Sequence, residues 1–287
     1  MKTVVDWVNL QFLRGLGLES RMLPTDHGQV HALVGDGGGA LGTLVLFHGL
    51  SGSATGFRPL VERVLPHVSR IVLPEMLGHG RSEIPALGMN GQRVVRCMQQ
   101  AMEQLVPEPA VVFGNSLGGY LAIRYACAHP ERVRGLFLSS PAGAPMSAVQ
   151  AKGFVDRFRV LGYRDAIKLV EMGFAQPPKA RMLYAWGARS QFDVEPVIQL
   201  VESLGPRDML SPADLSSLHM PIHFAWGTEE RILLDQHLAF YQEHLPPQAV
   251  KMRPEGWGHT PVAEVPDSVA HHLMALLTEL GPPKSSP

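Results

Sequence analysis

The sequence is poor in cysteine. Its 287 residues include only Cys97 and Cys127, and each lies within a helix-like pattern. A chain of this length can bury a full hydrophobic core without disulfide cross-links. We therefore expect two buried, reduced thiols rather than a disulfide, and we predict a cytoplasmic location because that compartment keeps thiols reduced.

An excess of charge of either sign is also missing. The chain has 25 basic and 26 acidic side chains and a formal net charge of -1, so it offers no field that would hold nucleic acid. Metal motifs are missing too: there is no HExxH and no paired cysteine spacing, and His27 and His31 lie on a predicted hairpin rather than a helix. We predict no metal, no cofactor and no nucleic-acid partner.

No window reaches the roughly 18 apolar residues of a membrane-spanning helix. Polar residues also interrupt residues 1–18, so we find no signal peptide there. Apolar residues do recur in this segment at helical spacing, namely Val4, Trp7, Val8, Phe12 and Leu16. We expect an amphipathic helix packed on its own domain, with a homodimer or membrane contact as alternatives, and no stable membrane insertion.

Short apolar runs alternate with helical patterns along the rest of the chain. Eight runs are typical of strands, at residues 20–23, 29–34, 43–49, 70–75, 110–115, 133–140, 221–227 and 248–254. The first two predict an antiparallel hairpin. The others are nearly continuously apolar and are separated by helical segments, which predicts a mostly parallel sheet covered on both faces. The fold class is therefore α/β, with residues 19–141 and 219–280 forming one core domain.

The alternation of strand and helix patterns stops between the sixth and seventh predicted strands. Residues 142–218 predict several helices without a strand, and such an insertion is too long for a plain loop. We expect a helical cap laid over the sheet, and a disordered tail at 281–287.

A serine stands at a sharp corner of the chain. Gly114, Ser116 and Gly118 form a G-x-S-x-G motif between a predicted strand and a predicted helix. This turn exposes a serine hydroxyl beside the amide groups of a helix N-terminus, so it favours a nucleophile next to an anion site.

A serine nucleophile needs a base and an acid that orients it. His259 lies in a loop before the last helix, at the end of the sheet where the carboxyl ends of parallel strands open. For the acid, Glu230 is the preferred candidate after the strand at 221–227, and Glu229 and Asp235 remain alternatives. The chain order serine, acid, histidine is the one expected on this type of sheet.

Acyl transfer also needs amide groups directed at the developing oxyanion. The N–H of Leu117 follows the nucleophile directly. The second donor should come from the loop after the third strand, where His48 and Gly49 precede Leu50. We therefore predict an oxyanion hole made by Leu50 and Leu117.

Four motifs in order, HGLSGS, LPEMLGHGRS, GNSLGG and GHTPVAEVP, resemble those of the α/β-hydrolases. The resemblance spans about residues 21–280 and implies a capped serine hydrolase with Ser116 as nucleophile, His259 as base and Glu230 as acid. It also implies that Leu50 and Leu117 form the oxyanion hole. Glu230 and Glu75 depart from the family, which usually has aspartate at both positions. The resemblance makes His79 a structural turn residue.

The nucleophile limits the chemistry. A serine at this corner favours an acyl-enzyme, and relatives that open epoxides or remove halides use a carboxylate there. We predict hydrolysis of small-molecule carboxylic esters, with a substrate pocket built from cap residues Phe174, Tyr184, Trp186 and Arg189.

Two other functions stay open. Asn115 before the serine resembles carbon-carbon hydrolases of ring-cleavage products, in which Arg189 would hold a substrate carboxylate. Those enzymes commonly have tryptophan after the catalytic histidine, where this chain has Thr260. The other alternative is a protein of this fold that binds a ligand without turnover.

Overall fold

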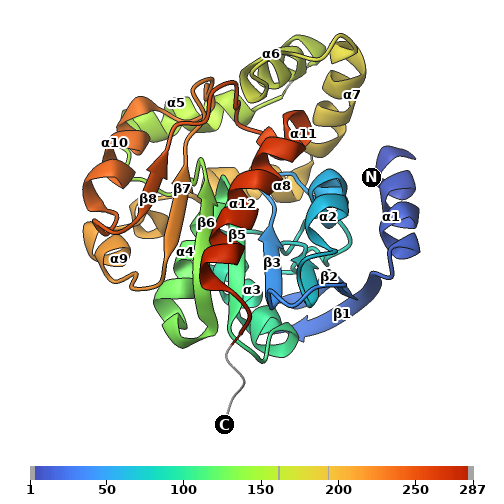
Figure 1. Ribbon diagram of the computed structural model, residues 1–287. Helices are drawn as coiled ribbons and strands as arrows, with labels where there is room; N and C mark the ends of the chain where they lie inside the picture. Colours follow the sequence, from blue (N-terminus) through green and yellow to red (C-terminus); the bar gives the residue numbers. More distant parts are fainter. Residues whose placement is uncertain (1–3, 161, 193, 284–287) are drawn as a thin grey trace.

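A computed structural model describes residues 4–160, 162–192 and 194–283 (Figure 1). One eight-stranded sheet forms the centre, with strand order β1-β2-β4-β3-β5-β6-β7-β8. The strands are β1 (Glu19–Thr25), β2 (Gly28–Asp36), β3 (Thr43–Phe47), β4 (Arg70–Pro74), β5 (Ala110–Asn115), β6 (Val133–Ser139), β7 (Ile222–Ala225) and β8 (Val250–Met252). All eight predicted strands are present.

The pairing of the strands follows the prediction. β2 is antiparallel to both of its neighbours, β1 and β4, and every other neighbouring pair is parallel. The central strands β3, β4, β5 and β6 are almost wholly buried, because helices cover both faces of a parallel sheet. The predicted α/β fold with an opening hairpin is confirmed.

Helices pack against both faces of the sheet and form one layer on each face. On one face, α3 (Gly91–Leu105), α4 (Leu117–Ala128) and α10 (Asp235–His244) share a buried cluster with the sheet. On the other face, α1 (Val4–Gly15), α2 (Arg58–Val64) and α12 (Pro266–Leu280) contribute to a second cluster. Figure 1 shows α12 crossing the sheet, with α2 and α1 beside it. The sheet therefore has a separate apolar core on each side.

The final helix is shorter than the sequence pattern predicts. The pattern predicts one helix over 262–280, but the structure has α11 (Pro261–Glu264) and then α12 from Pro266. Val265 between them has φ -136° and ψ 55°, outside the helical region. Proline has no amide hydrogen and disfavours helical geometry in the residue before it, so Pro266 starts a new helix.

Four of the helices between β6 and β7 form what we call the cap segment: α5 (Ala148–Phe158), α6 (Tyr163–Gly173), α7 (Arg181–Phe192) and α8 (Glu195–Ser203). Figure 1 shows α5, α6 and α7 grouped at the top, above the central strands. Two short elements, η3 (Pro206–Asp208) and α9 (Pro212–Ser216), return the chain to the sheet.

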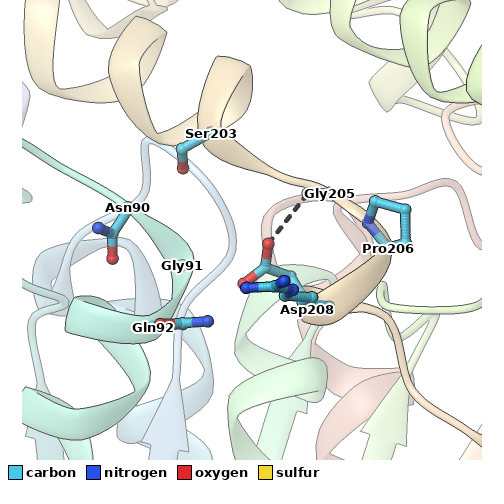
Figure 2. Close-up of a pocket in the computed structure, with 8 residues that line it drawn as sticks. Asn90, Gly91, Gln92, Ser203, Gly205, Pro206 and Asp208 are labelled. Carbon is cyan, nitrogen blue, oxygen red and sulfur yellow. Dashed lines mark hydrogen bonds between the residues drawn. The ribbon is translucent and has the colours of Figure 1, made fainter.

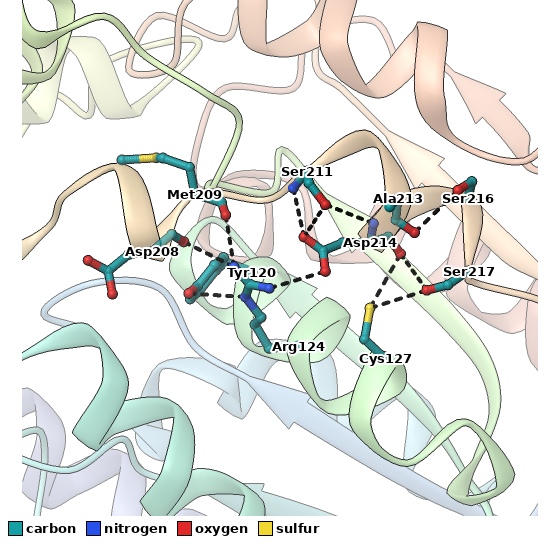
Figure 3. Close-up of polar contacts among 10 residues, drawn as sticks. All are labelled: Tyr120, Arg124, Cys127, Asp208, Met209, Ser211, Ala213, Asp214, Ser216 and Ser217. Atoms are coloured by element: carbon teal, nitrogen blue, oxygen red, sulfur yellow. Dashed lines mark hydrogen bonds and ion pairs between the residues drawn. The ribbon is translucent and has the colours of Figure 1, made fainter.

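Arg124 on α4 anchors this returning chain (Figure 3). Its guanidinium donates to the carbonyl of Met209 at 2.8 Å and pairs with Asp214 at 3.3 Å. The Cys127 thiol, one turn further along α4, donates to the Asp214 carbonyl at 3.3 Å. Helix α4, which begins directly after Ser116, is thereby fixed to the chain that returns from the cap segment to the sheet.

The ends of the chain are only partly described. Residues 1–3 of the predicted N-terminal helix and residues 284–287 of the predicted tail lie outside the described residues. Gly281, the first residue of that tail, accepts a hydrogen bond from Arg134 at 2.7 Å. Among the described helices, none combines the length and hydrophobicity needed to cross a bilayer. Cys97 is buried and Cys127 is half-buried, and both are free thiols.

Candidate active site

Ser116 occupies a strained turn between β5 and α4. Its φ of 55° and ψ of -121° lie in a region that residues other than glycine rarely adopt. The flanking glycines make this turn possible, because a Cβ on Gly114 would lie 2.4 Å from the Gly118 carbonyl oxygen. A Cβ on Gly118 would lie 2.2 Å from the carbonyl oxygen of Phe47. Only glycine fits at either position, as the G-x-S-x-G motif predicts.

The loop after β3 approaches this corner closely. A Cβ on Gly49 would lie 3.4 Å from the Cβ of Ser116. The Gly49 carbonyl accepts a hydrogen bond from the amide of Gly52 at 3.0 Å and lies 2.8 Å from Nδ1 of His48. Leu50 is the next residue of this loop after Gly49, and Leu117 is the first residue of α4. The two residues predicted for the oxyanion hole therefore lie on segments that meet at Ser116.

His48 holds the loop from inside the protein. Its Nε2 accepts a hydrogen bond from the amide of Met76 at 3.0 Å, so Nδ1 carries the proton and donates to the Gly49 carbonyl. Burial lowers the pKa of the His48 ring, which keeps the ring neutral as this arrangement requires.

The predicted base and acid lie together. Nδ1 of His259 is 2.8 Å from Oε2 of Glu230, whose side chain is only 2% exposed. The other carboxylate oxygen, Oε1, accepts hydrogen bonds from the amides of Ile232 at 2.8 Å and Leu233 at 3.0 Å. Burial by itself would raise the pKa of this carboxyl, but the His259 ring, the Leu233 amide and the Ser140 side chain outweigh it and lower the pKa to about 2. Glu230 is therefore ionised at neutral pH.

The structure separates Glu230 from the alternative acids. Glu229 pairs with Arg231 at 2.7 Å and is 44% exposed, and Asp235 is exposed at the start of α10. Of these three carboxylates, only Glu230 contacts His259. The extra methylene of glutamate is accommodated by the loop of Ile232 and Leu233, whose amides fold around the carboxylate.

Asn115 connects the corner to the base. Its side-chain amide donates to the backbone carbonyl of His259 at 3.1 Å and to the carbonyl of Ser139 at 3.1 Å. Within the described part of the chain, no hydrogen bond joins the Ser116 hydroxyl directly to the His259 ring. Catalytic hydrogen bonds are commonly loose without substrate, so the connection through Asn115 is the one that fixes the two loops relative to each other.

The cap segment is bonded to the loop that carries His259. The carbonyl of Gly173, at the end of α6, accepts hydrogen bonds from the amides of His259 at 2.9 Å and Thr260 at 3.1 Å, and from the Thr260 hydroxyl at 3.1 Å. The amide of Ala175 donates to the Glu264 carboxylate at 2.6 Å. The sequence analysis missed Thr260 and Glu264 as site residues, although both belong to the GHTPVAEVP motif.

The predicted cap contacts lie at different depths. Phe174 is half-buried next to the Gly173 junction, and its ring contacts that of Tyr184 with centroids 5.4 Å apart. Tyr184 and Trp186 are 46% and 50% exposed on α7. Arg189 lies over the ring of Tyr163 at 5.2 Å. Of these four, Phe174 is the one that continues directly from the segment bonded to His259, and the substrate role of all four stays a prediction.

A second buried histidine–glutamate pair is formed by Glu75 of the LPEMLGHGRS motif and His31 on β2. Oε2 of Glu75 is 2.9 Å from Nδ1 of His31 and accepts a hydrogen bond from the amide of Arg81 at 2.5 Å. Oε1 accepts from the amide of Ala54 at 3.1 Å. His79 is buried in the same motif, and burial lowers its pKa to about 4, which fits its predicted role in the turn.

Elsewhere, a shallow hollow of about 340 Å³ lies between the start of α3 and the end of α8 (Figure 2). Asn90, Gly91, Ser203 and Asp208 contribute to its lining, and the Asp208 carboxylate accepts a hydrogen bond from the Gly205 amide at 2.9 Å. Ser116, His259 and Glu230 do not line this hollow. In the described parts of the chain, no group of three or more histidine, cysteine or acidic residues could hold a metal ion.

Comparison with known proteins points to hydrolases. The chain is 22% identical to lipase 1 of Psychrobacter immobilis over 275 residues, covering 90% of this chain and 84% of the lipase. It is 37% identical over 98 residues to the pimeloyl-[acyl-carrier protein] methyl ester esterase of Yersinia enterocolitica, a match that covers 34% of this chain and 35% of the esterase.

A solved structure supports the same fold. The 2-hydroxy-6-oxo-6-phenylhexa-2,4-dienoate hydrolase of Rhodococcus sp. strain RHA1 superimposes with a TM-score of 0.75 at 21% identity, covering 91% of this chain and 99% of that one. Residues 42–166 also match the family described as the alpha/beta hydrolase fold. The family match over residues 42–166 and the shared fold show that this chain has the α/β-hydrolase fold.

Proposed function

We propose that this protein is a serine hydrolase that cleaves carboxylic esters through an acyl-enzyme on Ser116. The observation that carries the proposal is the strained serine corner next to a buried His259–Glu230 pair. A backbone held at φ 55° costs on the order of 1–3 kcal/mol, and such strain persists mainly where it serves a site.

The proposed reaction begins at the His259 ring. Because Nδ1 faces the ionised Glu230 at 2.8 Å, that nitrogen carries the proton, which leaves Nε2 free to accept the Ser116 proton. The serine oxygen then attacks the ester carbonyl. The amides of Leu50 and Leu117 stabilise the negative charge that develops on the carbonyl oxygen, aided by the N-terminus of α4.

The second half of the reaction returns the enzyme to its starting state. Protonated His259 donates its proton to the departing alcohol, and a water molecule then enters the site. His259 removes a proton from this water as the oxygen attacks the acyl carbon. The bond between that carbon and the Ser116 oxygen then breaks, His259 returns the proton to the Ser116 oxygen, and the carboxylic acid leaves. Glu230 stays ionised and stabilises the charged imidazole in both halves.

Ester hydrolysis is favoured over carbon-carbon hydrolysis by the role of two residues. Asn115, which suggested the carbon-carbon hydrolases, has a structural role here because its side chain joins the Ser139 and His259 backbones. Thr260 takes the position after the histidine and bonds the cap segment. The lipase and esterase relatives also support ester cleavage.

A burst assay with short and medium p-nitrophenyl esters tests the proposal. We expect a burst and turnover from the wild type, and a loss on the order of 10⁴-fold or more in Ser116→Ala, because the other groups cannot replace the nucleophile. Glu230→Gln should also lose turnover, and Glu229→Gln is the matched control because its carboxylate does not face His259.

Two outcomes would reject the proposal. If no ester gives a burst or turnover with the wild type, a dienone acid from ring cleavage becomes the substrate to test, and its turnover would establish the carbon-carbon hydrolase. If Ser116→Ala retains turnover equal to the wild type, the acyl-enzyme on Ser116 is wrong.

A further inference from the structure

The outer part of the cap segment exposes an unusual number of large apolar side chains. We call residues 163–192, which include α6 and α7, the α6–α7 tip. At the start of α7, Met182, Leu183, Tyr184 and Trp186 are 58%, 61%, 46% and 50% exposed. Single exposed apolar residues are common, but four within five positions form a patch that marks an interaction surface. Helix α1 has a patch of the same density at Val4, Val5, Trp7 and Val8, but this helix carries one acidic and one basic residue and so has no excess of positive charge.

The same tip carries an excess of positive charge. It contains five basic residues and only two acidic ones, although the whole chain has a net charge of -1. Four of the basic side chains are exposed: Arg164, Lys168, Lys179 and Arg181. Exposed tryptophan, tyrosine and leucine bordered by basic residues are the composition of surfaces that bind at the interface of anionic lipid.

Charge also argues against a second copy of the chain as the partner. Two tips meeting face to face would bring like charges together, which opposes association. An anionic lipid surface would instead neutralise the basic residues while its acyl chains receive the apolar ones. The charge of the tip therefore favours lipid over a copy of itself.

The position of the tip ties it to the reaction. Tyr184 packs against Phe174, and Phe174 follows Gly173, whose carbonyl binds the amides of His259 and Thr260. A lipid surface that contacts α7 would thus lie within one short segment of the predicted base. Figure 1 places α6 and α7 at the outer end of the molecule, where a flat surface can reach them.

We propose that the α6–α7 tip docks on anionic lipid surfaces and that the site hydrolyses esters of hydrophobic acyl chains held in them. The second half of this proposal rests on the ester hydrolysis proposed above. The docking half concerns reversible contact with the lipid surface, and no helix inserts across the bilayer.

The test is co-sedimentation of the full chain with vesicles of phosphatidylcholine alone or mixed three to one with phosphatidylglycerol. We expect at least about tenfold stronger binding to the mixed vesicles, weakening as salt rises. Met182→Ser/Leu183→Ser should remove most of the binding, and Lys179→Glu/Arg181→Glu should remove the preference for phosphatidylglycerol.

The matched control is Ile84→Ser/Leu87→Ser in the loop before α3, because these aliphatic residues are also exposed, at 63% and 72%, but lie outside the tip. This control should bind vesicles like the wild type. Equal loss in both serine pairs, or no binding by the wild type, overturns the assignment of docking to the tip. A dimer that Met182→Ser/Leu183→Ser dissociates, without vesicle binding, assigns the tip to a second copy and also overturns it.

Turnover separates docking from chemistry. Water-soluble p-nitrophenyl butyrate should be hydrolysed equally, within about twofold, by the wild type and by Met182→Ser/Leu183→Ser, whereas medium-chain esters placed in mixed vesicles should be hydrolysed at least about fivefold more slowly by the variant. If vesicle binding is present and no ester is hydrolysed, the proposed ester hydrolysis fails and the docking half stands. If soluble ester is hydrolysed and vesicles do not bind, the docking half fails alone.

Discussion

Two buried histidine–glutamate pairs in this protein have similar nitrogen–oxygen distances, but of the two only the His259–Glu230 contact has hydrogen-bond geometry. Glu230 lies 2.8 Å from Nδ1 of His259, and Glu75 lies 2.9 Å from Nδ1 of His31. Both carboxylates are almost fully buried, and each accepts two backbone amide hydrogen bonds. Both have a lowered pKa despite burial, because the facing histidine and the amides stabilise the charged form.

Their surroundings differ. The first pair joins the loops that follow β7 and β8, and Asn115 ties it to the strained Ser116. The second pair connects β2, the start of η1 (Ala54–Phe57) through Ala54, and the G-H-G-R-S turn through Arg81. The comparison teaches that a buried carboxylate–imidazole pair does not by itself define a catalytic site. We propose a catalytic role for the first pair because Asn115 connects it to the Ser116 corner, and a supporting role for the second because it joins segments of the core.

The roles of the two pairs are distinguished most clearly by neutralising each carboxylate in turn and measuring kcat. We expect Glu230→Gln to lower kcat by at least about a hundredfold, because the amide no longer stabilises the charged imidazole. We expect Glu75→Gln to change the kcat of the folded fraction by less than about tenfold. Comparable losses in both variants would show that the Glu75 pair takes part in catalysis.

The stability of the same two variants should show the opposite order. In Glu75→Gln, the new NH₂ group faces either the Ala54 amide or the Arg81 amide, which are both donors, or the ring of His31. Breaking a buried pair in this way costs about 3 kcal/mol or more, and this pair joins three segments of the core. Urea unfolding should show a larger loss for Glu75→Gln than for Glu230→Gln, and a smaller loss would refute the supporting role.

Acid should lower the free energy of unfolding through both pairs. Glu230 has a pKa of about 2 in the folded protein against an ordinary value of 4.5, so its contribution is complete above about pH 4.5 and is lost as the pH falls towards 2. The lowered pKa of Glu75 acts in the same direction. The free energy of unfolding should therefore decrease below pH 4.5, with a shallower slope in Glu230→Gln. An unchanged slope in that variant would contradict the lowered pKa.

The smallest expected effect concerns the junction of the cap with the first pair. Thr260→Val removes the hydroxyl that donates to Gly173 at 3.1 Å but keeps the side-chain shape and both amide hydrogen bonds. Loss of one such hydrogen bond, about 1 kcal/mol, should lower kcat about fivefold if the junction positions His259. Thr260→Ser is the control and should retain kcat. Equal kcat in both variants would limit the junction to a structural role.

Several features of the fold follow from the sequence because they depend on local patterns. Apolar runs of strand length between helical segments predict the parallel sheet, and the strained corner follows from glycines at 114 and 118, since larger residues would clash there. The break before Pro266 was also present in the sequence, but the apolar periodicity of 262–280 concealed it. Local chemistry predicts the geometry of the serine corner because the constraints on it act within five residues.

The sequence favours Glu230 over Glu229 but leaves Glu229 open, and the tertiary structure shows how the two residues differ. The two carboxylates are adjacent and chemically identical, and what separates them is the fold of the following loop, which directs one carboxylate to His259 and the other to Arg231. The Gly173 junction and the exposure of α7 came only from the tertiary structure. By itself, the sequence determined the sheet, the corner and the identity of the serine, because these depend on residue type and spacing. Which side chains meet across distant loops was decided by packing, because such contacts depend on the whole fold.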